Sequence, residues 1–337
     1  MNLKKLLLIA TVVAALVSSH TFAADLATSS DDSKSISNGR FNLELSTKYV
    51  YSKNHTKFQS QHNTTNGIPE TGATLDWSGL YSNNIELNAK LTDKETNLFT
   101  KGAVNVGKGF DKSGLMRDTD YKSNGQTIGD STSEAKVSHD QNIRIDFGKD
   151  YIINETKVSP FVGFYYAKTK LDSFGVTFNP VDDPAVIYTP NAITPGVFAN
   201  TSVLGLAYET IIKAPRVGVL LSQSLSEALS VDVEVALMPY AHMTLNDWHY
   251  QNPSKVQDGN PNGVAKGTGW GYSTDVLINY QLTKASKVGF GVRYTDFIMH
   301  NSDFTDRMVT GTNTTTDGLK ELSIQNFGLM ASYQYKF

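Results

Sequence analysis

The feature that most constrains this chain is a two-residue alternation of apolar and polar side chains near its end. In the segment LSIQNFGLMASYQYKF, apolar and aromatic residues from Phe327 to Phe337 fall on one face, and mainly polar or small residues fall on the other. A period of two is typical of a β-strand whose two faces meet different environments. The same alternation returns in WGYSTDVLINYQL and NNIELNAKL. These stretches are longer than the strands of most soluble sandwiches, so a different kind of sheet is indicated.

Long alternating strands of this kind predict a barrel in a membrane. Inside a bilayer every backbone polar group must be hydrogen-bonded within the protein, so spanning strands have to close into a ring. The apolar face then meets lipid, and the polar face lines the lumen. The final Phe337, after alternating aromatic residues, also resembles the end of bacterial outer-membrane proteins.

The number of strands follows from the connections between the alternating stretches. Short and long connections alternate, as periplasmic turns and extracellular loops do in such barrels. The tight turns lie at 92–95, 150–156, 225–228 and 283–286, and the long polar loops at 53–73, 108–134, 179–200, 246–266 and 300–321. The strands lie near 41–52, 74–91, 96–107, 135–149, 157–178, 201–224, 229–245, 267–282, 287–299 and 322–337. The predicted fold class is an all-β, ten-stranded antiparallel transmembrane β-barrel of the outer membrane.

The beginning of the chain predicts export. Two lysines within Met1–Lys5 precede an apolar run from Leu6 to Val17, and small residues end at Ala23, which is the pattern of a secretory signal peptide. About a dozen apolar residues are too few for a membrane-spanning helix. We therefore expect a signal peptide at 1–23, a flexible segment at 24–40, and a barrel with five long extracellular loops at 41–337.

Composition excludes some classes of partner and cofactor. The chain has no cysteine, so it has neither disulfides nor a thiolate metal site. With 33 acidic against 30 basic residues, it shows no excess of positive charge that would favour nucleic acid. We expect a monomer in the outer membrane, with no metal and no cofactor.

Two polar pairs fall at strand ends on the predicted outer rim. GLMRDTDYKS places Asp118 and Asp120 two residues apart, and LNDWHYQNP places Asp247 and His249 two residues apart. Each pair alone is common in solvated loops and is a weak signal. In a ring of ten strands, however, the two pairs could face each other across the mouth.

Such an arrangement has a specific chemistry. An aspartate orients a histidine that takes a proton from water. Two carboxyl groups placed together resist losing both protons, so one of them can stay protonated near neutral pH. The four residues Asp118, Asp120, Asp247 and His249 therefore predict peptide hydrolysis without a metal or a covalent nucleophile.

The motifs resemble those of the omptin family of outer-membrane proteases. GLMRDTDY resembles that family's Met-x-Asp-x-Asp-Trp with Tyr121 at the last position, DWHY resembles its Asp-x-His-Tyr, and TLDWSGLY resembles its second strand. The segment KAPRVGV stands where the family has Pro-x-x-Gly. The resemblance implies a ten-stranded barrel whose catalytic residues are Asp247 and His249, with Asp118 and Asp120 opposite. It also implies peptide or protein substrates at the cell surface.

Two further expectations follow from the resemblance. Family members that cut beside basic residues carry two carboxylates in the substrate pocket, and Lys48 and Leu245 stand at those positions, with Glu44 as an alternative source of charge. We therefore expect poor cleavage of dibasic peptides. The family also depends on bound lipopolysaccharide as an activator, and Lys168 fills one of its basic positions, whereas Ile211 fills another.

Two other functions remain open from the sequence. Loops rich in Asn, Thr and Gly suit a surface barrel that acts as an adhesin or host-contact protein without protease activity. A small diffusion channel ranks last, because a ring of ten strands leaves a lumen that side chains can mostly fill.

Overall fold

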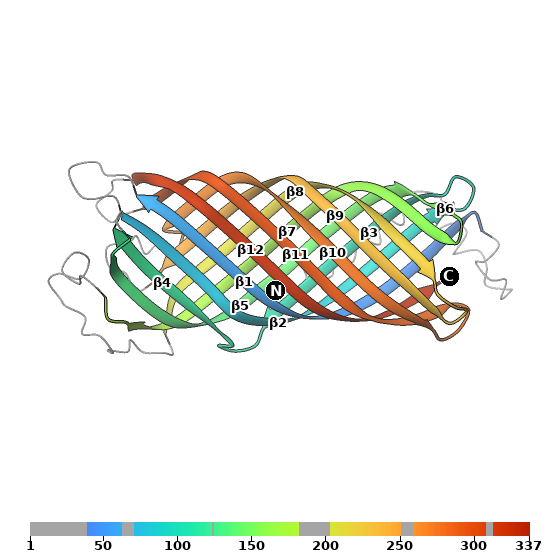
Figure 1. Cartoon of the computed structure of the whole chain (residues 1–337), viewed down its shortest axis with the longest axis horizontal. Helices are drawn as coiled ribbons and strands as arrows, with labels where there is room; N and C mark the ends of the chain where they lie inside the picture. The colour runs from blue at the N-terminus through green and yellow to red at the C-terminus, as the bar shows by residue number, and fades with distance from the viewer. Residues whose placement is uncertain (1–38, 63–70, 123–124, 182–202, 251–258, 308–312) are drawn as a thin grey trace.

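The computed structural model describes residues 39–62, 71–122, 125–181, 203–250, 259–307 and 313–337 (Figure 1). The predicted signal peptide and almost all of the predicted flexible segment lie outside these residues. In the described ranges the chain forms strands and no helix. The strands are β1 (Phe41–His62), β2 (Thr71–Asp93), β3 (Leu98–Gly109), β4 (Gly114–Lys122), β5 (Thr127–Lys149), β6 (Tyr151–Ile153), β7 (Thr156–Phe178), β8 (Leu204–Ser224), β9 (Leu229–His249), β10 (Gly263–Gln281), β11 (Ser286–Arg307) and β12 (Asn313–Lys336).

The strands form a closed antiparallel barrel with ten positions around the ring. β3 and β4 share one position, because both pair with β2 on one side and with β5 on the other. The three-residue β6 continues β5 along β7, and pairing of β1 with β12 closes the ring. The predicted fold class is confirmed. No helix of the described residues is long and apolar enough to cross a membrane.

The strands are longer than predicted at the end that carries the long connections. β1 runs to His62, β9 runs to His249 and β12 begins at Asn313, so much of the predicted loops 53–73, 246–266 and 300–321 is strand. The predicted loop 108–134 contains β4 and the start of β5. These extensions were missed because both faces of a strand can be polar once it leaves the bilayer, and the apolar alternation then disappears.

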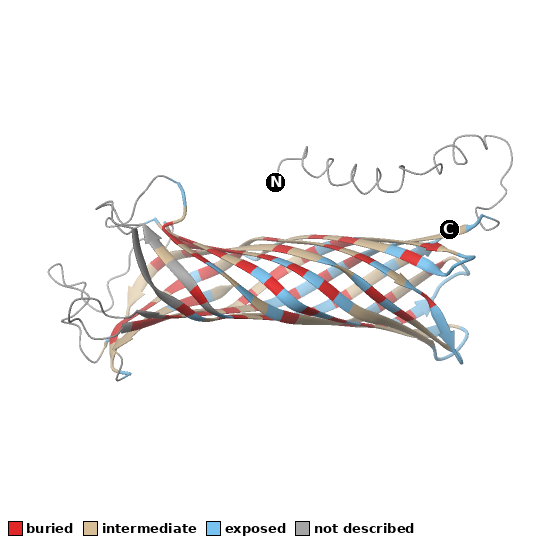
Figure 2. Cartoon of the chain, turned by 90° about the horizontal axis from the view of Figure 1, so that it is seen from above, coloured by how far each residue is buried: buried red, intermediate tan, exposed pale blue. Residues whose placement is uncertain are grey.

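Exposed apolar side chains form a band around the half of the barrel that carries the short turns. Figure 2 shows exposed and buried residues alternating along the strands there. The band is well represented on β2, β11 and β12, by Ile85, Leu87, Phe290, Val292, Phe327, Leu329, Tyr333 and Tyr335. Such a band is the lipid-facing surface of a membrane barrel. The strand segments beyond it, toward the long connections, stand outside the membrane-spanning part.

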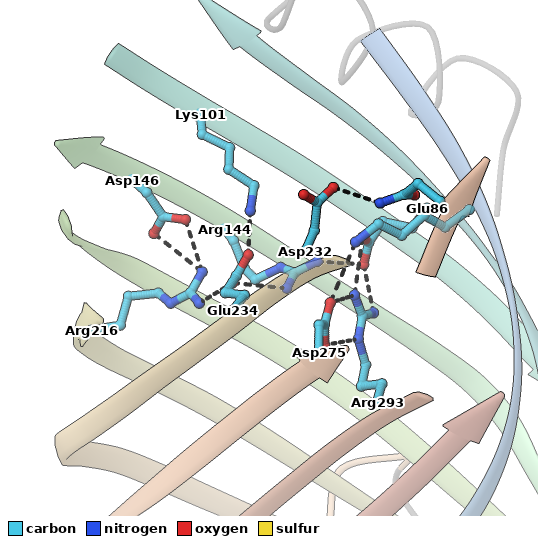
Figure 3. A network of polar contacts seen from close by, with 11 residues as sticks. Glu86, Lys101, Arg144, Asp146, Arg216, Asp232, Glu234, Asp275 and Arg293 are labelled. Carbon is cyan, nitrogen blue, oxygen red and sulfur yellow. Dashed lines mark hydrogen bonds and ion pairs between the residues drawn. The ribbon is translucent and has the colours of Figure 1, made fainter. Parts of the chain in front are cut away.

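The lumen at the level of the apolar band is filled by a network of buried ion pairs (Figure 3). Glu86 lies 2.5 Å from Arg144 and 2.7 Å from Arg293, and Arg293 lies 2.5 Å from Asp275. A second group joins Glu234 and Asp146 through Arg216, at 2.6 and 3.0 Å. Lys101 also pairs with Glu234. Buried charges are tolerated only when paired, so these partners explain how a narrow barrel can hold so many of them.

Two cavities lie in the lumen on either side of this network. A cavity of about 510 Å³ opens near the short turns and is lined by lysines and carboxylates, Glu44 and Lys90 among them. A smaller one of about 70 Å³ is lined by Asn and Thr side chains such as Asn54 and Thr169 and by apolar ones such as Val50.

Above the smaller cavity, toward the long connections, an apolar layer crosses the lumen. It belongs to a cluster of buried side chains from strands all around the ring. Members near its upper end are Phe58, Leu75, Trp77, Tyr208, Met243 and Leu245. The lumen is therefore closed by ion pairs at one level and by hydrocarbon at another.

The last residues of the segment predicted to be flexible are held against the barrel. Arg40 Nη2 lies 2.7 Å from Asp93 Oδ2, and Lys94 Nζ donates to the carbonyl oxygen of Gly39 at 2.9 Å. The described part of that segment is thus ordered by contacts with the first turn.

Candidate active site

The predicted histidine pair lies at the end of β9. Its side chains follow Leu245 on the inward face, because residues two apart on a strand point the same way. His249 Nε2 lies 2.7 Å from Asp247 Oδ2. Asp247 is buried, while the His249 side chain is about a quarter exposed. The pair was expected in a loop, and that expectation was wrong: a strand holds it, and so fixes the direction of both side chains.

A residue that the sequence did not indicate supports this pair. Asn262, just before β10, is 2% exposed. Its Oδ1 accepts from the backbone N–H of His249 at 2.7 Å, and its own N–H donates to the carbonyl oxygen of Asp247 at 2.7 Å. The backbone of the pair is therefore held from the neighbouring strand. No local sequence motif marks Asn262 for this role. The role is seen only from the position of Asn262 beside the end of β9.

The acidic pair lies on β4. Asp118 and Asp120 share the inward face with the fully buried Met116. Asp118 is in register with Leu75 on β2, and Asp120 with Ala73. The Oδ1 atom of Asp118 is buried and has no hydrogen-bond partner among the described residues. This pair was also expected in a loop, and β4 is the strand that the prediction lacked.

The two pairs act on each other electrostatically. Burial, and then the charge of Asp120, raise the pKa of Asp118 to about 8, against a smaller lowering by His249. Burial also raises the pKa of Asp120 to about 6, and His249 again opposes it. The strand register places the two pairs around one space at the mouth of the barrel: Phe58, which is linked to Asp118 through Leu75, contacts the ring of Tyr208, and Tyr208 is the register partner of Asp247. At neutral pH that space contains an imidazole and a carboxyl group that keeps its proton.

The floor of this space is apolar. Leu245 lies one inward position below Asp247 and is fully buried. Phe58 on β1 is in register with Leu75, which is the register partner of Asp118. All three belong to the apolar layer, so a side chain that entered between the two pairs would meet hydrocarbon rather than charge.

Lys48 is not part of this space. Its Nζ lies 3.4 Å from Glu86 Oε1 and 3.4 Å from Asp275 Oδ2, within the ion-pair network at the level of the apolar band. The prediction that Lys48 and Leu245 share a substrate pocket was wrong. β1 is longer than the alternation suggested, and its inward residue beside the site is Phe58, ten positions further on. The alternative, Glu44, lines the cavity near the short turns.

Lys168 lies on the outer wall of β7, as a lipid-contacting residue would. Its Nζ is 2.8 Å from Glu209 Oε2 on β8, and Glu209 also accepts from Asn246. Its register partner on β8 is Ile211. A role for Lys168 in binding lipopolysaccharide stays a prediction.

Within the described ranges, no three side chains of His, Cys, Asp or Glu are grouped as a metal site would need.

A closed ring of antiparallel strands with an apolar outer band defines this chain as an outer-membrane β-barrel. It belongs to the Protochlamydia outer membrane protein family, whose model matches residues 42–335. A comparison with curated proteins finds no match.

A solved structure shows the same fold. The outer membrane protease OmpT from Escherichia coli superposes with a TM-score of 0.70 at 15% identity, over 88% of this chain and 97% of that one. The translocator domain of autotransporter NalP from Neisseria meningitidis aligns with a TM-score of 0.34 at 9% identity, over 88% of each chain. The likeness to OmpT shows an omptin-like barrel, and at this identity it shows the fold alone.

Proposed function

We propose that this protein is an endopeptidase of the outer membrane whose active site faces outward. The observation that carries the proposal is the contact of 2.7 Å between His249 Nε2 and Asp247 Oδ2, opposite an acidic pair with raised pKa values. OmpT is an outer membrane protease, and its fold is the one found here.

In the proposed reaction His249 acts as the general base. Asp247 orients the imidazole and stabilises its protonated form. His249 takes a proton from water as the water oxygen attacks the peptide carbonyl carbon. The proton is then passed to the amine that leaves, so acid and base roles are both served by one imidazole.

Asp118 and Asp120 have the complementary role. The shared proton, held mainly by Asp118, is donated in a hydrogen bond to the carbonyl oxygen as negative charge develops there. The ionised partner holds the attacking water. Neither step calls for a metal or a covalent intermediate.

The apolar floor supports a preference for neutral substrates. A lysine or arginine side chain placed against Phe58 and Leu245 would lose its hydration without gaining a carboxylate. We propose peptides or surface proteins with an apolar residue beside the cleaved bond. Lipopolysaccharide as an activator remains part of the proposal, with Lys168 as one contact.

The same geometry distinguishes between the two alternative functions, an adhesin and a diffusion channel. The strand segments beyond the apolar band give an adhesin a protruding surface, and this is the second candidate. A diffusion channel is disfavoured by the ion-pair network and the apolar layer that fill the lumen. The test is to refold the mature chain with lipopolysaccharide and screen a peptide library. Failure to cleave any peptide would leave the adhesin as the better reading.

A further inference from the structure

Tyr208 lies directly beside the proposed dyad and crosses the lumen. It is 1% exposed, and its register partner on β9 is Asp247. β8 lies on the opposite side of the ring from β1 and β2. The Tyr208 ring nevertheless contacts Trp77 and Phe58, with centroids 5.8 and 6.1 Å apart. These aromatic rings form a bar beneath the space between the two polar pairs.

This bar carries two buried donors. Neither the Tyr208 hydroxyl nor Trp77 Nε1 has a hydrogen-bond partner among the described residues. A buried donor without a partner destabilises a fold by roughly 1–3 kcal/mol, so such groups are retained where a water or a ligand serves them. Phe58 and Leu245 beside them carry no polar atom, and phenylalanine at position 208 would fill the same space. Packing alone therefore does not account for the hydroxyl.

The charged neighbour of the hydroxyl is Asp247. Burial, and then the negative charge of Asp247, raise the pKa of Tyr208, so the phenol stays protonated and acts as a donor. Oδ2 of Asp247 faces His249. A second hydrogen bond to the same carboxylate would fix its orientation, as partners of catalytic carboxylates do.

We propose that Tyr208 is a positioning residue: its hydroxyl donates through one water molecule to the Asp247 carboxylate and holds that carboxylate against His249. The kinetic part of this inference rests on the proposed peptidase function, and the electrostatic part does not.

The hydrogen bond has a measurable effect on His249. A donor to the carboxylate withdraws negative charge from it, so the neighbouring imidazole holds its proton less tightly. Removing the hydroxyl should therefore move the titration midpoint of His249 to higher pH. The titratable groups near His249 include Asp247 on β9, and Asp118 and Asp120 on β4, with Tyr208 on β8 beside Asp247.

The test compares Tyr208→Phe with Tyr165→Phe in the full mature chain. Both substitutions keep the ring and remove a hydroxyl from the lumen, and Tyr165 packs against Phe297 deeper in the barrel. Refolding is checked by heat-modifiable mobility. The titration of His249 is followed by NMR of histidine-labelled protein in micelles, with the signal assigned from His249→Gln.

We expect Tyr208→Phe to shift the His249 titration to higher pH and to lower kcat about tenfold with little change in KM, the rate equivalent of one hydrogen bond to a charged group. Tyr165→Phe should do neither. An unchanged His249 titration in a refolded Tyr208→Phe barrel overturns the inference. If wild-type protein cleaves nothing but the titration still shifts, the peptidase proposal fails and the link between Tyr208 and Asp247 stands.

Discussion

His249 Nε2 and Asp247 Oδ2 lie 2.7 Å apart on one inward face of β9. A second pair of the same kind lies on the outer wall, where His55 Nε2 is 3.0 Å from Asp76 Oδ1. We expect His249→Ala to lower turnover by about 10²–10⁴-fold, because it removes the proposed general base. His55→Ala also removes an imidazole that is paired with an aspartate, but this one lies outside the lumen. The change should therefore leave turnover unchanged. Full activity in a refolded His249→Ala barrel would move the active site elsewhere.

Activity should fall on the alkaline side as the acidic pair ionises. The pKa of Asp118 is raised to about 8 by burial and then by Asp120, so the carboxyl group that donates to the carbonyl oxygen is lost above that pH. Asp118→Asn should abolish the alkaline limb together with most of the activity. A rate that keeps rising beyond pH 9 would contradict the role given to this pair.

The same raised pKa has a consequence for stability. A carboxyl group whose folded pKa exceeds its ordinary value near 3.8 stabilises the fold at low pH, and this stabilisation is lost as the pH rises through about 8. Asp118→Asn should therefore be more stable than wild type at pH 9 and equal to it below pH about 3.8. Thermal unfolding in detergent at both pH values measures the difference, and equal stability at pH 9 would show that Asp118 ionises without penalty.

The apolar floor should determine which peptides the protein cleaves. Wild-type protein should cleave peptides with an apolar residue far better than peptides with paired arginines or lysines. The double change Phe58→Glu with Leu245→Asp should improve dibasic cleavage, because it supplies two carboxylates beside the site. The ratio of kcat/KM for the two substrate classes is the measurement. A dibasic preference in wild type would mean that the substrate side chain binds elsewhere than on this floor.

Chelators and reagents that block serine or cysteine nucleophiles should leave activity intact. The reason is that the proposed chemistry uses only the four acid and base side chains. Lipopolysaccharide is itself bridged by divalent cations, so the assay uses detergent-solubilised protein with lipid supplied. Loss in EDTA that zinc restores would contradict the mechanism.

Breaking the buried network should destabilise the barrel strongly. Glu86→Gln leaves Arg144 and Arg293 without their shared carboxylate, and removing one partner of a buried ion pair costs about 3–5 kcal/mol. Arg40→Gln breaks a well-formed but exposed pair with Asp93 and should change stability little. Equal midpoints in guanidinium unfolding of the two variants would show that the network is solvated.

The barrel was predictable from sequence because lipid enforces the alternation. Residues such as Leu329 and Tyr333 must be apolar on the lipid side, so the spanning parts of the strands were assigned correctly. No such demand acts on Gln59 or Asp118, which lie on strands beyond the band, and these strands were predicted as loops.

The sequence predicted the acid and base residues of the site, but not the residues that surround them. Asp247 and His249 are two residues apart in sequence and carry their own motif, whereas Phe58 and Tyr208 reach the site from other strands and Asn262 reaches it from the connection before β10. Their contribution depends on the register between strands. A two-residue period does not fix that register, so Lys48 was placed beside the site when it belongs to the network far below.

The filled lumen also affects the permeability of the membrane that carries this protein. In the described part of the chain, buried ion pairs and an apolar layer occupy the lumen at two levels, and both oppose the passage of ions and polar nutrients through the barrel. Such a protein can be inserted in many copies without making the envelope permeable. Products of the proposed peptidase reaction would then be released on the side of the membrane that carries the long connections.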